Sequence, residues 1–329
     1  MNALIALVLV VGLFVAAVVG AASGLQWLFG VVLPYAAVAV FVVAFVYRVL
    51  SWARVPVPFR IPTTCGQEKS LPWIRQQKLE NPPDGRWVAG RMALEILFFR
   101  SLLRNTRVEQ LDGPRLVYTT SLGLWTGAMA MHWAMAVVLL RHLRFLTEPV
   151  PAVVTWVESV DGFLEIGLPV VFASSVIFLG ALIYLLARRL TSPLVRYISL
   201  VGDYFALLLL LGIGGSGFWM RYVSHLDVSA IKELMLGLTR FHPVIPGPIH
   251  PLFYGHLFLV CVLLAYFPFS KLMHMPGVFL SPTRNLANNS RAVRHVNPWD
   301  YPVDVHTYEE YEDEFREKMV TAGLPVERQ

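Results

Sequence analysis

Four histidines within two long apolar segments are the residues whose type and spacing could do chemistry. His132 and His142 lie ten residues apart in MHWAMAVVLLRHLR, and His256 and His274 lie eighteen residues apart in the run from 253 to 275. In an α-helix, eighteen residues complete a whole number of turns and rise ~27 Å, and ten residues rise ~15 Å. Each segment therefore presents one imidazole near each end of a helix that could cross a membrane.

The two histidine pairs match in depth if their helices run antiparallel. His142 then lies level with His256, and His132 lies level with His274. Two imidazoles at each of two depths are what two bis-imidazole haems require, because each neutral ring gives one nitrogen to iron and the porphyrin suits an apolar bundle interior. We predict two haem b groups, an inner one held by His132 and His274 and an outer one held by His142 and His256.

Other interpretations of these histidines remain open. A single histidine in a membrane segment is more often a hydrogen-bonded core residue or an interfacial residue than a metal ligand. His142, between Arg141 and Arg144, has the sequence context of an interfacial residue. A transporter with a histidine and glutamate proton relay would show paired repeats or broken helices in two halves, which we do not find. A purely structural anchor would not need four histidines at matched depths.

The composition is that of an integral membrane protein. Of 329 residues, 56% are hydrophobic and 15% are charged, whereas soluble chains are usually ~45–50% apolar and ~25% charged. The two cysteines form no CxxC motif, so an iron–sulfur cluster must belong to a partner. The net charge of +5 comes mainly from basic residues in loops between apolar runs, which argues against nucleic-acid binding.

The sequence predicts an all-α bundle of about six transmembrane helices. Each apolar run has the ~20 residues that a membrane span needs, and the first is long enough to be an uncleaved span. Basic residues gather in the loops that follow the second and fourth spans and in the tail, so both termini are expected in the cytoplasm of a bacterial or archaeal cell, on its cytoplasmic (inner) membrane. The expected spans are 3–22, 30–50, 117–144, 164–187, 198–221 and 251–273.

The chain divides into four expected parts. These are two N-terminal transmembrane helices (1–50), a basic cytoplasmic loop with an amphipathic helix near 90–106 (51–115), a dihaem four-helix core (116–280) and a cytoplasmic tail (281–329). In the tail, Thr307 and Glu310 form a capping-box pattern, and Gly323 can end the helix. An aromatic stripe that includes Tyr311 and Phe315 favours docking of this helix onto a partner.

Small and aromatic residues add two structural expectations. The GIGGSG run at 212–217 lies inside the fifth span, where small residues allow a helix or a haem face to approach the backbone closely. Trp125, Trp133 and Trp156 could line a haem or lie at the membrane interface, and the sequence does not choose between these places.

The segment GHLFLVCVLLAYFPFSKLMHMPG resembles the last span of respiratory nitrate reductase gamma subunits, a family of dihaem cytochromes b. This resemblance covers about residues 117–280 and implies that the four histidines are haem ligands. The first span, the loop 51–115 and the tail, with its SPTRN and VHTYEEYEDEFR stretches, are more similar to the DsrM family. That family contains the membrane cytochrome b of the sulfite-reductase-associated DsrMKJOP complex.

The DsrM resemblance implies an electron-transfer subunit of a quinone-linked oxidoreductase. It implies a cytoplasmic iron–sulfur partner (DsrK), a periplasmic multihaem cytochrome c (DsrJ), a ferredoxin-like subunit (DsrO) and a second membrane subunit (DsrP). The final cytoplasmic substrate would be the trisulfide or persulfide form of the carrier DsrC. The alternatives are a nitrate reductase gamma subunit and the membrane cytochrome b of a heterodisulfide reductase-type complex, and the direction of electron flow stays open.

Exchange with menaquinol or another quinone also requires a group that takes or gives protons, because a haem transfers electrons alone. The family resemblance implies a quinone site near the outer haem. Glu158, Asp161 and Glu165, at the expected outer start of the fourth span, and the nearby Arg144 are the candidates. Glu165 is favoured because a carboxylate one turn inside a span is costly without a function. A salt bridge of Glu165 to Arg141 or Arg144 is the alternative.

Overall fold

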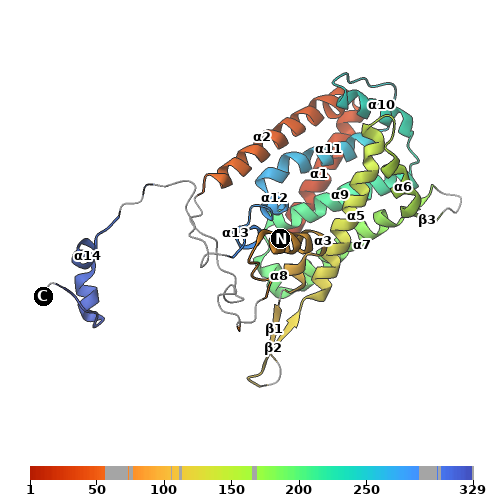
Figure 1. Ribbon diagram of the computed structural model, residues 1–329. Helices are drawn as coiled ribbons and strands as arrows, with labels where there is room; N and C mark the ends of the chain where they lie inside the picture. The colour runs from red at the N-terminus through yellow and green to blue at the C-terminus, as the bar shows by residue number, and fades with distance from the viewer. Residues whose placement is uncertain are drawn as a thin grey trace.

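The protein folds as a helical bundle, seen here in a computed structural model (Figure 1). The structure describes residues 1–55, 73, 77–104, 106–110, 113–164, 169–288, 302 and 305–327. Six helical segments in this part of the chain are long and apolar enough to cross a membrane. They are α1 (Asn2–Ala22), η1 with α2 (Leu28–Val32, Leu33–Ala53), α5 (Leu122–Leu146), α7 (Ala173–Thr191), α9 (Val201–Tyr222) and α11 with η2 (Pro251–Tyr266, Phe267–Phe269).

Shorter elements connect or cover these six segments. Among the described residues, the strands form only two antiparallel ribbons, β1 with β2 and β3 with β4. The helices are α3 (Gly85–Phe98), α4 (Arg100–Leu103), α6 (Ala152–Asp161), α8 (Pro193–Ile198), α10 (Val228–Thr239), η3 (Lys271–Met273), α12 (His274–Gly277), α13 (Pro282–Asn285) and α14 (Tyr308–Thr321), and the strands are β1 (Thr106–Gln110), β2 (Leu116–Thr120), β3 (Gly162–Leu164) and β4 (Val171–Phe172).

The core helices form an arc rather than a closed ring. Helix α5 packs on α7, α7 on α9, and α9 on α11, while α1 and α2 pack along α11. In the described part of the chain, no extensive backbone contact joins α5 directly to α11, the two helices on which the four histidines were expected. One apolar core joins α1, α2, α10 and α11, and a second joins α5, α7 and α9. Helix α5 is therefore linked to α11 mainly through α7 and α9.

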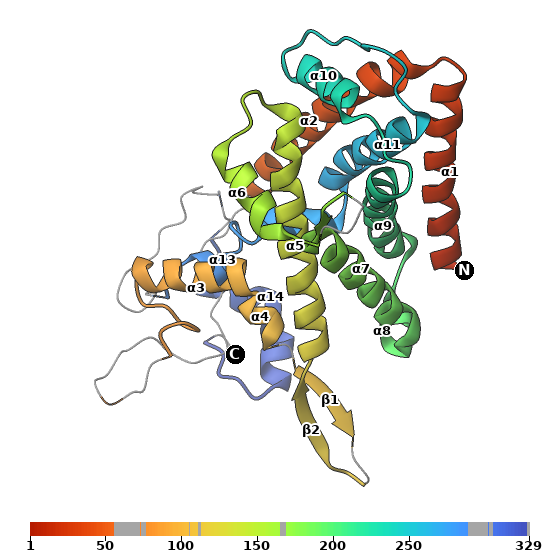
Figure 2. The ribbon, with the colours of Figure 1, turned by 90° about the vertical axis from the view of Figure 1, so that its right-hand side faces the viewer.

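The two ends of the bundle differ in what covers them. Figure 2 shows α10 at one end and α8 with the β1–β2 ribbon at the other. At the α10 end, the Tyr35 hydroxyl donates to the Leu238 carbonyl (3.0 Å), and Lys232 pairs with Glu148 just after α5. At the opposite end, here the α3 end, α5 begins, α11 finishes and α3 and α4 lie across the start of α5.

Glycines and alanines set how closely the helices approach. The buried face of α1 includes Ala6, Ala17 and Ala21, spaced so that they lie along one stripe. A Cβ at Gly255 of α11 would lie 2.6 Å from the Phe14 ring of α1, so only glycine fits this contact. In the GIGGSG run, a Cβ at Gly214 would lie 2.9 Å from Leu179 of α7. The expected close approach at 212–217 is therefore present.

Three expected elements differ from the structure. The third span begins at Leu122, because residues 116–120 pair with β1, and the fourth begins at Ala173 rather than 164. The expected helix at 90–106 instead runs over Gly85–Phe98, capped by Asp84, and breaks at Phe99. The sequence pattern had no glycine or proline there to indicate that break.

The last span is not one continuous helix as far as His274. Pro268 lacks the N–H that an α-helix needs, and α11 gives way after Tyr266 to a 3₁₀ turn and an extended Ser270 (φ −115°, ψ 175°). The Ser270 hydroxyl then accepts from the Leu272 N–H and starts a second 3₁₀ turn. His274 therefore belongs to the separate helix α12, and the expectation of one helical face for His256 and His274 is wrong.

The tail helix α14 has the ends that the sequence predicted. Thr307 Oγ1 accepts from the Glu310 N–H (3.3 Å), and a Glu310 carboxylate oxygen accepts from the Thr307 N–H (2.9 Å). Gly323 follows the helix in the left-handed conformation (φ 70°). Figure 1 shows α14 apart from the bundle, and Tyr308 and Tyr311 are exposed.

Candidate functional site

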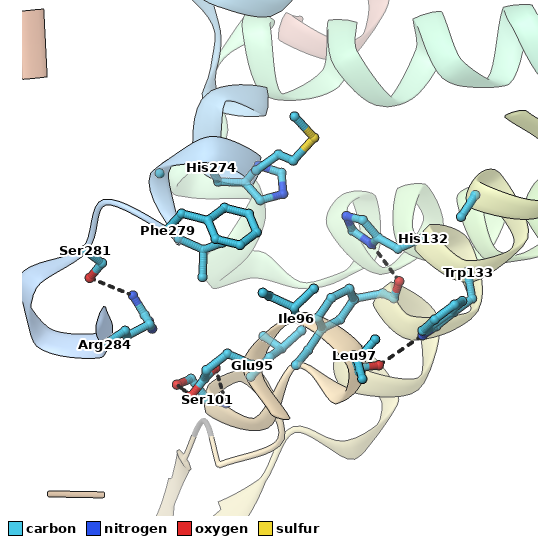
Figure 3. Close-up of a pocket in the computed structure, with 17 residues that line it drawn as sticks. Glu95, Ile96, Leu97, Ser101, His132, Trp133, His274, Phe279, Ser281 and Arg284 are labelled. Atoms are coloured by element: carbon cyan, nitrogen blue, oxygen red, sulfur yellow. Dashed lines mark hydrogen bonds between the residues drawn. The ribbon is translucent and has the colours of Figure 1, made fainter. Parts of the chain in front are cut away.

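His132 and His274 come together at the α3 end of the bundle. His132 projects from α5 and His274 from α12, and Figure 3 shows both rings directed into one cavity. Their ring centroids are 6.0 Å apart, and the ring planes are inclined by 85°. Metal–imidazole bonds of about 2 Å on each side of one ion would place two ring centroids roughly 6 Å apart. The pair therefore has the spacing of two axial ligands.

The cavity around this pair has a volume of about 900 Å³, within the range of ~300–1,000 Å³ typical of cofactor pockets. Ala128 and Ala136 lie one turn to either side of His132 and line the same wall. Their short side chains leave room for a flat ring system beside the imidazole. Arg284 and Ser281 add polar groups to a lining that is otherwise mostly apolar. The residues present fit a haem at this position.

His142 and His256 form the second pair, toward the α10 end. The two residues are close enough to interact electrostatically. His142 is exposed in the structure, whereas His256 is partly buried. Gly217 of α9 lies beside His256, and a Cβ there would be 3.3 Å from the ring's Cε1 atom.

The Nδ1 atom of every one of these four histidines lies within hydrogen-bond distance of an oxygen atom. The partners are Ala128 O for His132 (2.8 Å), Val138 O for His142 (2.7 Å), Lys271 O for His274 (2.9 Å) and Ser216 Oγ for His256 (2.9 Å). Since a carbonyl only accepts, Nδ1 must carry the proton in His132, His142 and His274. A neutral ring then keeps its free lone pair on Nε2, the atom available to a metal.

Ser216 fixes the fourth ring in the same way. Its hydroxyl lies 3.0 Å from the Ile213 carbonyl, to which it donates, so its oxygen is free to accept from His256 Nδ1. All four rings are thus oriented by an acceptor at Nδ1, as metal-bound histidines usually are. Among the described residues, no three His, Cys, Asp or Glu side chains gather as a site for a metal ion alone, whereas a haem needs only two axial imidazoles.

A buried polar cluster lies next to the second histidine pair. Arg141 Nη1 donates to Asp161 Oδ2 (2.9 Å) and to Ser174 Oγ (3.0 Å), and its guanidinium lies 3.2 Å from the centroid of the Phe172 ring. Asp161 also accepts from the Ser174 N–H (2.7 Å) and from the Ser174 hydroxyl (2.6 Å). Arg221 stacks on Phe172 from α9, at 4.5 Å. Both carboxylate oxygens of Asp161 therefore accept hydrogen bonds from the protein.

Glu158 is held more loosely than Asp161. It pairs with Arg144 (2.9 Å), whose side chain is 45% exposed, whereas the side chains of Arg141 and Asp161 are 12% and 8% exposed. Glu165 lies outside the described residues. Because α7 begins at Ala173, the reason for favouring Glu165, a position one turn inside a span, does not hold.

The structure adds residues to the site that the sequence pattern did not single out. Ser216 lies in the glycine-rich run at 212–217, whose sequence pattern predicts a place of close approach and not a source of hydrogen bonds. A hydroxyl in a span next to the one that carries His256 could have been considered as a partner for that ring. Phe99 lies edge-on to His132, with ring centroids 4.9 Å apart, and no sequence pattern pointed to it. Trp133 lines the cavity, and Trp125 donates to the nearby Phe98 carbonyl (2.7 Å). Trp156, in contrast, is exposed.

Comparison with known proteins agrees with this architecture. The sequence profile of the nitrate reductase gamma subunit family matches residues 117–295. The "Hdr-like menaquinol oxidoreductase cytochrome b-like subunit" of Archaeoglobus fulgidus is 46% identical over 285 residues, which are 84% of this chain and 85% of that protein. The protein of the same name from Archaeoglobus profundus is 40% identical over 275 residues, 82% of this chain and 81% of that protein. The six helices and the family match agree in showing a multi-pass membrane bundle, and the chain belongs to the nitrate reductase gamma subunit family.

Proposed function

We propose that this protein is a membrane dihaem cytochrome b that exchanges electrons between the menaquinone pool and a cytoplasmic iron–sulfur subunit. The observation that carries the proposal is the set of four histidines on α5, α11 and α12, each with its Nδ1 atom on an oxygen, of which the His132 and His274 rings lie 6.0 Å apart. The names of the two Archaeoglobus relatives, cytochrome b-like subunits of menaquinol oxidoreductases, support the same function.

The chain's own residues would hold and insulate the cofactors. His132 and His274 would bind the inner haem iron and His142 and His256 the outer one, each through Nε2. A bound haem supplies one-electron transfer at a potential set by its ligands and its surroundings. The acceptors at Nδ1 keep each ring turned toward the iron and raise the basicity of the ligand nitrogen. The alanines beside His132 leave one wall of the inner site flat.

The quinone site belongs, in this proposal, near the outer pair and at the end of α6. Glu158 suits the exchange of a proton with a quinol, because it is held by one partly exposed arginine, Arg144. Asp161 suits a positioning role, since its oxygens are already engaged by Arg141 and Ser174. Both lie within a few residues of Glu165 in the sequence, and Glu165 stays a candidate from the sequence alone.

The finer assignment is to the DsrM type of this family. The sequence of the tail supports it, and the partners would then be DsrK, DsrJ, DsrO and DsrP, with the DsrC trisulfide or persulfide as final substrate. The names of the two relatives support the alternative, a heterodisulfide reductase-type complex, and copurification of the partners would distinguish the two. Both termini would lie in the cytoplasm of a bacterial or archaeal cell, where α14 presents exposed Tyr308 and Tyr311 to a partner.

Haem content and reduction by quinol test the proposal. In the purified full-length protein, we expect a b-type α-band in the dithionite-reduced minus oxidised spectrum and about two haems per chain by the pyridine haemochrome assay. A reduced menaquinol analogue should give the same band. Absence of the α-band in protein purified with its complex would overturn the proposal, and a band that dithionite produces but quinol does not would overturn its quinone part.

Replacing Ser216 with alanine should weaken the outer site selectively. The change removes the acceptor at His256 Nδ1 and adds no bulk. Loss of such an outer-shell partner typically lowers metal affinity about 10–100-fold, so the variant should lose part of its outer haem during detergent purification. The measurement is haem stoichiometry after purification, with Ser216→Thr, which keeps the hydroxyl, as the control. Equal stoichiometry in all three proteins would show that this hydrogen bond does not support the site.

A further inference from the structure

A segment that precedes the family-matched region lines one side of the inner cavity. Helices α3 and α4, which lie before residue 117, supply Glu95, Ile96, Leu97, Phe99, Ser101 and Leu102 to its lining. Figure 3 shows this segment facing His132 and His274 across the cavity. Helices α5 and α12 thus provide the histidines, whereas a segment before the family-matched region provides the opposite wall. We call residues 85–104, which include α3, Phe99 and α4, the lid.

The lid is shaped by a break at Phe99. This residue has φ 48° and ψ 48°, the left-handed conformation, which is strained for a residue other than glycine. The break ends α3 and turns the Phe99 ring inward, where it meets the His132 ring edge-on, at 79°. Glu95 supports the turn by accepting from the Ser101 N–H (3.0 Å) and the Ser101 hydroxyl (2.5 Å). The strained residue is therefore the one in contact with a proposed iron ligand.

Two tryptophans of α5 fasten the lid. Because α3 ends at Phe98, the carbonyls of its last turn have no partner within the helix. Trp133 Nε1 donates to the Leu97 carbonyl (3.0 Å), and Trp125 Nε1 donates to the Phe98 carbonyl (2.7 Å). Glu80, which precedes the lid, pairs with Arg100 and Arg104 of its second half. The lid is thus attached to the helix that carries His132 and His142.

We propose that the lid excludes water from the inner haem and that Phe99 is a positioning residue for the His132 imidazole, so that a segment outside the family-matched region sets the potential of that haem. The inference rests on the proposed function. Solvent access to a metal site alters its potential, because water stabilises the more highly charged, ferric state. An open lid should therefore lower the midpoint potential of the inner haem and leave that of the outer haem unchanged.

The Phe99→Gly variant distinguishes the effect of the Phe99 ring from the effect of the backbone turn. Glycine adopts φ 48° without strain, so the lid keeps its turn while the ring is lost. We expect this variant of the full-length protein to retain two haems, to lower one midpoint potential in a redox titration, and to shift the low-spin ferric EPR signal of the same haem as the His132 ring reorients. Phe99→Leu, which keeps apolar bulk but not the ring, should shift the EPR signal with a smaller change in potential.

Phe98→Leu is the matched control, since Phe98 is the neighbouring phenylalanine and is 53% exposed. His274→Ala identifies the affected haem, because the potential missing in that variant belongs to the inner site. Two unchanged potentials and an unchanged EPR spectrum in Phe99→Gly would overturn the inference, even if its melting temperature fell. A shift of the outer haem instead would overturn it as well. Wild-type protein without haem would refute the proposed function itself, a result that the spectrum reveals first.

Discussion

Replacing His274 with alanine is expected to leave one haem per chain, and the haem that remains should be the outer one. His274 lies on α12, beyond the break that ends α11 at Tyr266, so its loss leaves the helix that carries His256 intact. With one imidazole missing, the inner iron loses its bis-histidine ligation. Replacing His142 with alanine should have the converse effect and retain the inner haem alone.

Pyridine haemochrome quantification together with EPR of the oxidised protein measures this outcome, since two low-spin haems with different surroundings give separable signals. His306→Ala is the control: this histidine is exposed, just before α14, and the variant should keep both haems. If both single variants removed the same signal, the pairing of His132 with His274 would be wrong. If neither lost haem, the histidines would serve packing or proton transfer.

Replacing Asp161 with asparagine is expected to have the largest effect on stability. The change leaves the Arg141 guanidinium largely buried without its counter-charge, while the side-chain shape is kept. Removing one partner of a buried ion pair typically costs about 3–5 kcal/mol. A large loss should appear as a lower melting temperature in detergent and as poor recovery of folded protein from membranes.

Glu158→Gln is the matched comparison on the same helix. Its partner Arg144 is 45% exposed, and such pairs usually contribute ~0–1 kcal/mol, so this variant should fold normally. Under the proposed function it should nevertheless oxidise a menaquinol analogue more slowly, with unchanged haem content. If Asp161→Asn melted at the wild-type temperature, Arg141 would not depend on that carboxylate, and the cluster would need another explanation.

The sequence predicted those features that follow from composition and periodicity. Six apolar runs predicted six helices, because a membrane span is defined by length and hydropathy. The ten-residue spacing of His132 and His142 was read correctly, since α5 is continuous over both residues. The interpretation of the eighteen-residue spacing of His256 and His274 assumed one continuous helix, but the helix does not continue past Pro268. The inner pair meets nevertheless, because α12 carries His274 back toward α5.

Other parts of the site depend on contacts between distant segments, which no local pattern reveals. Phe99 adopts a left-handed conformation without a glycine, so the break in the lid has no signature in the sequence. Arg141 and Arg144 at the end of the third span and Arg221 at the end of the fifth lie opposite the basic loops, so their positions run against the charge rule for orientation. The structure gives Arg141 and Arg144 carboxylate partners, and locally neutralised charges of this kind do not weigh against the expected orientation.

The open arc of helices has a consequence for how the protein is made. The histidines of each pair come from α5 and from the α11–α12 segment, more than a hundred residues apart in the chain, so neither site exists until the last membrane helix has been inserted. Since the inner cavity lies between α5 and α12, cofactor loading would, under the proposed function, join these two segments as a late step of biogenesis. A ribosome-bound chain that ends after α9 lacks His256 and His274 and would bind no haem with two histidines. Under the proposed function, bound haem would therefore indicate that membrane insertion is complete.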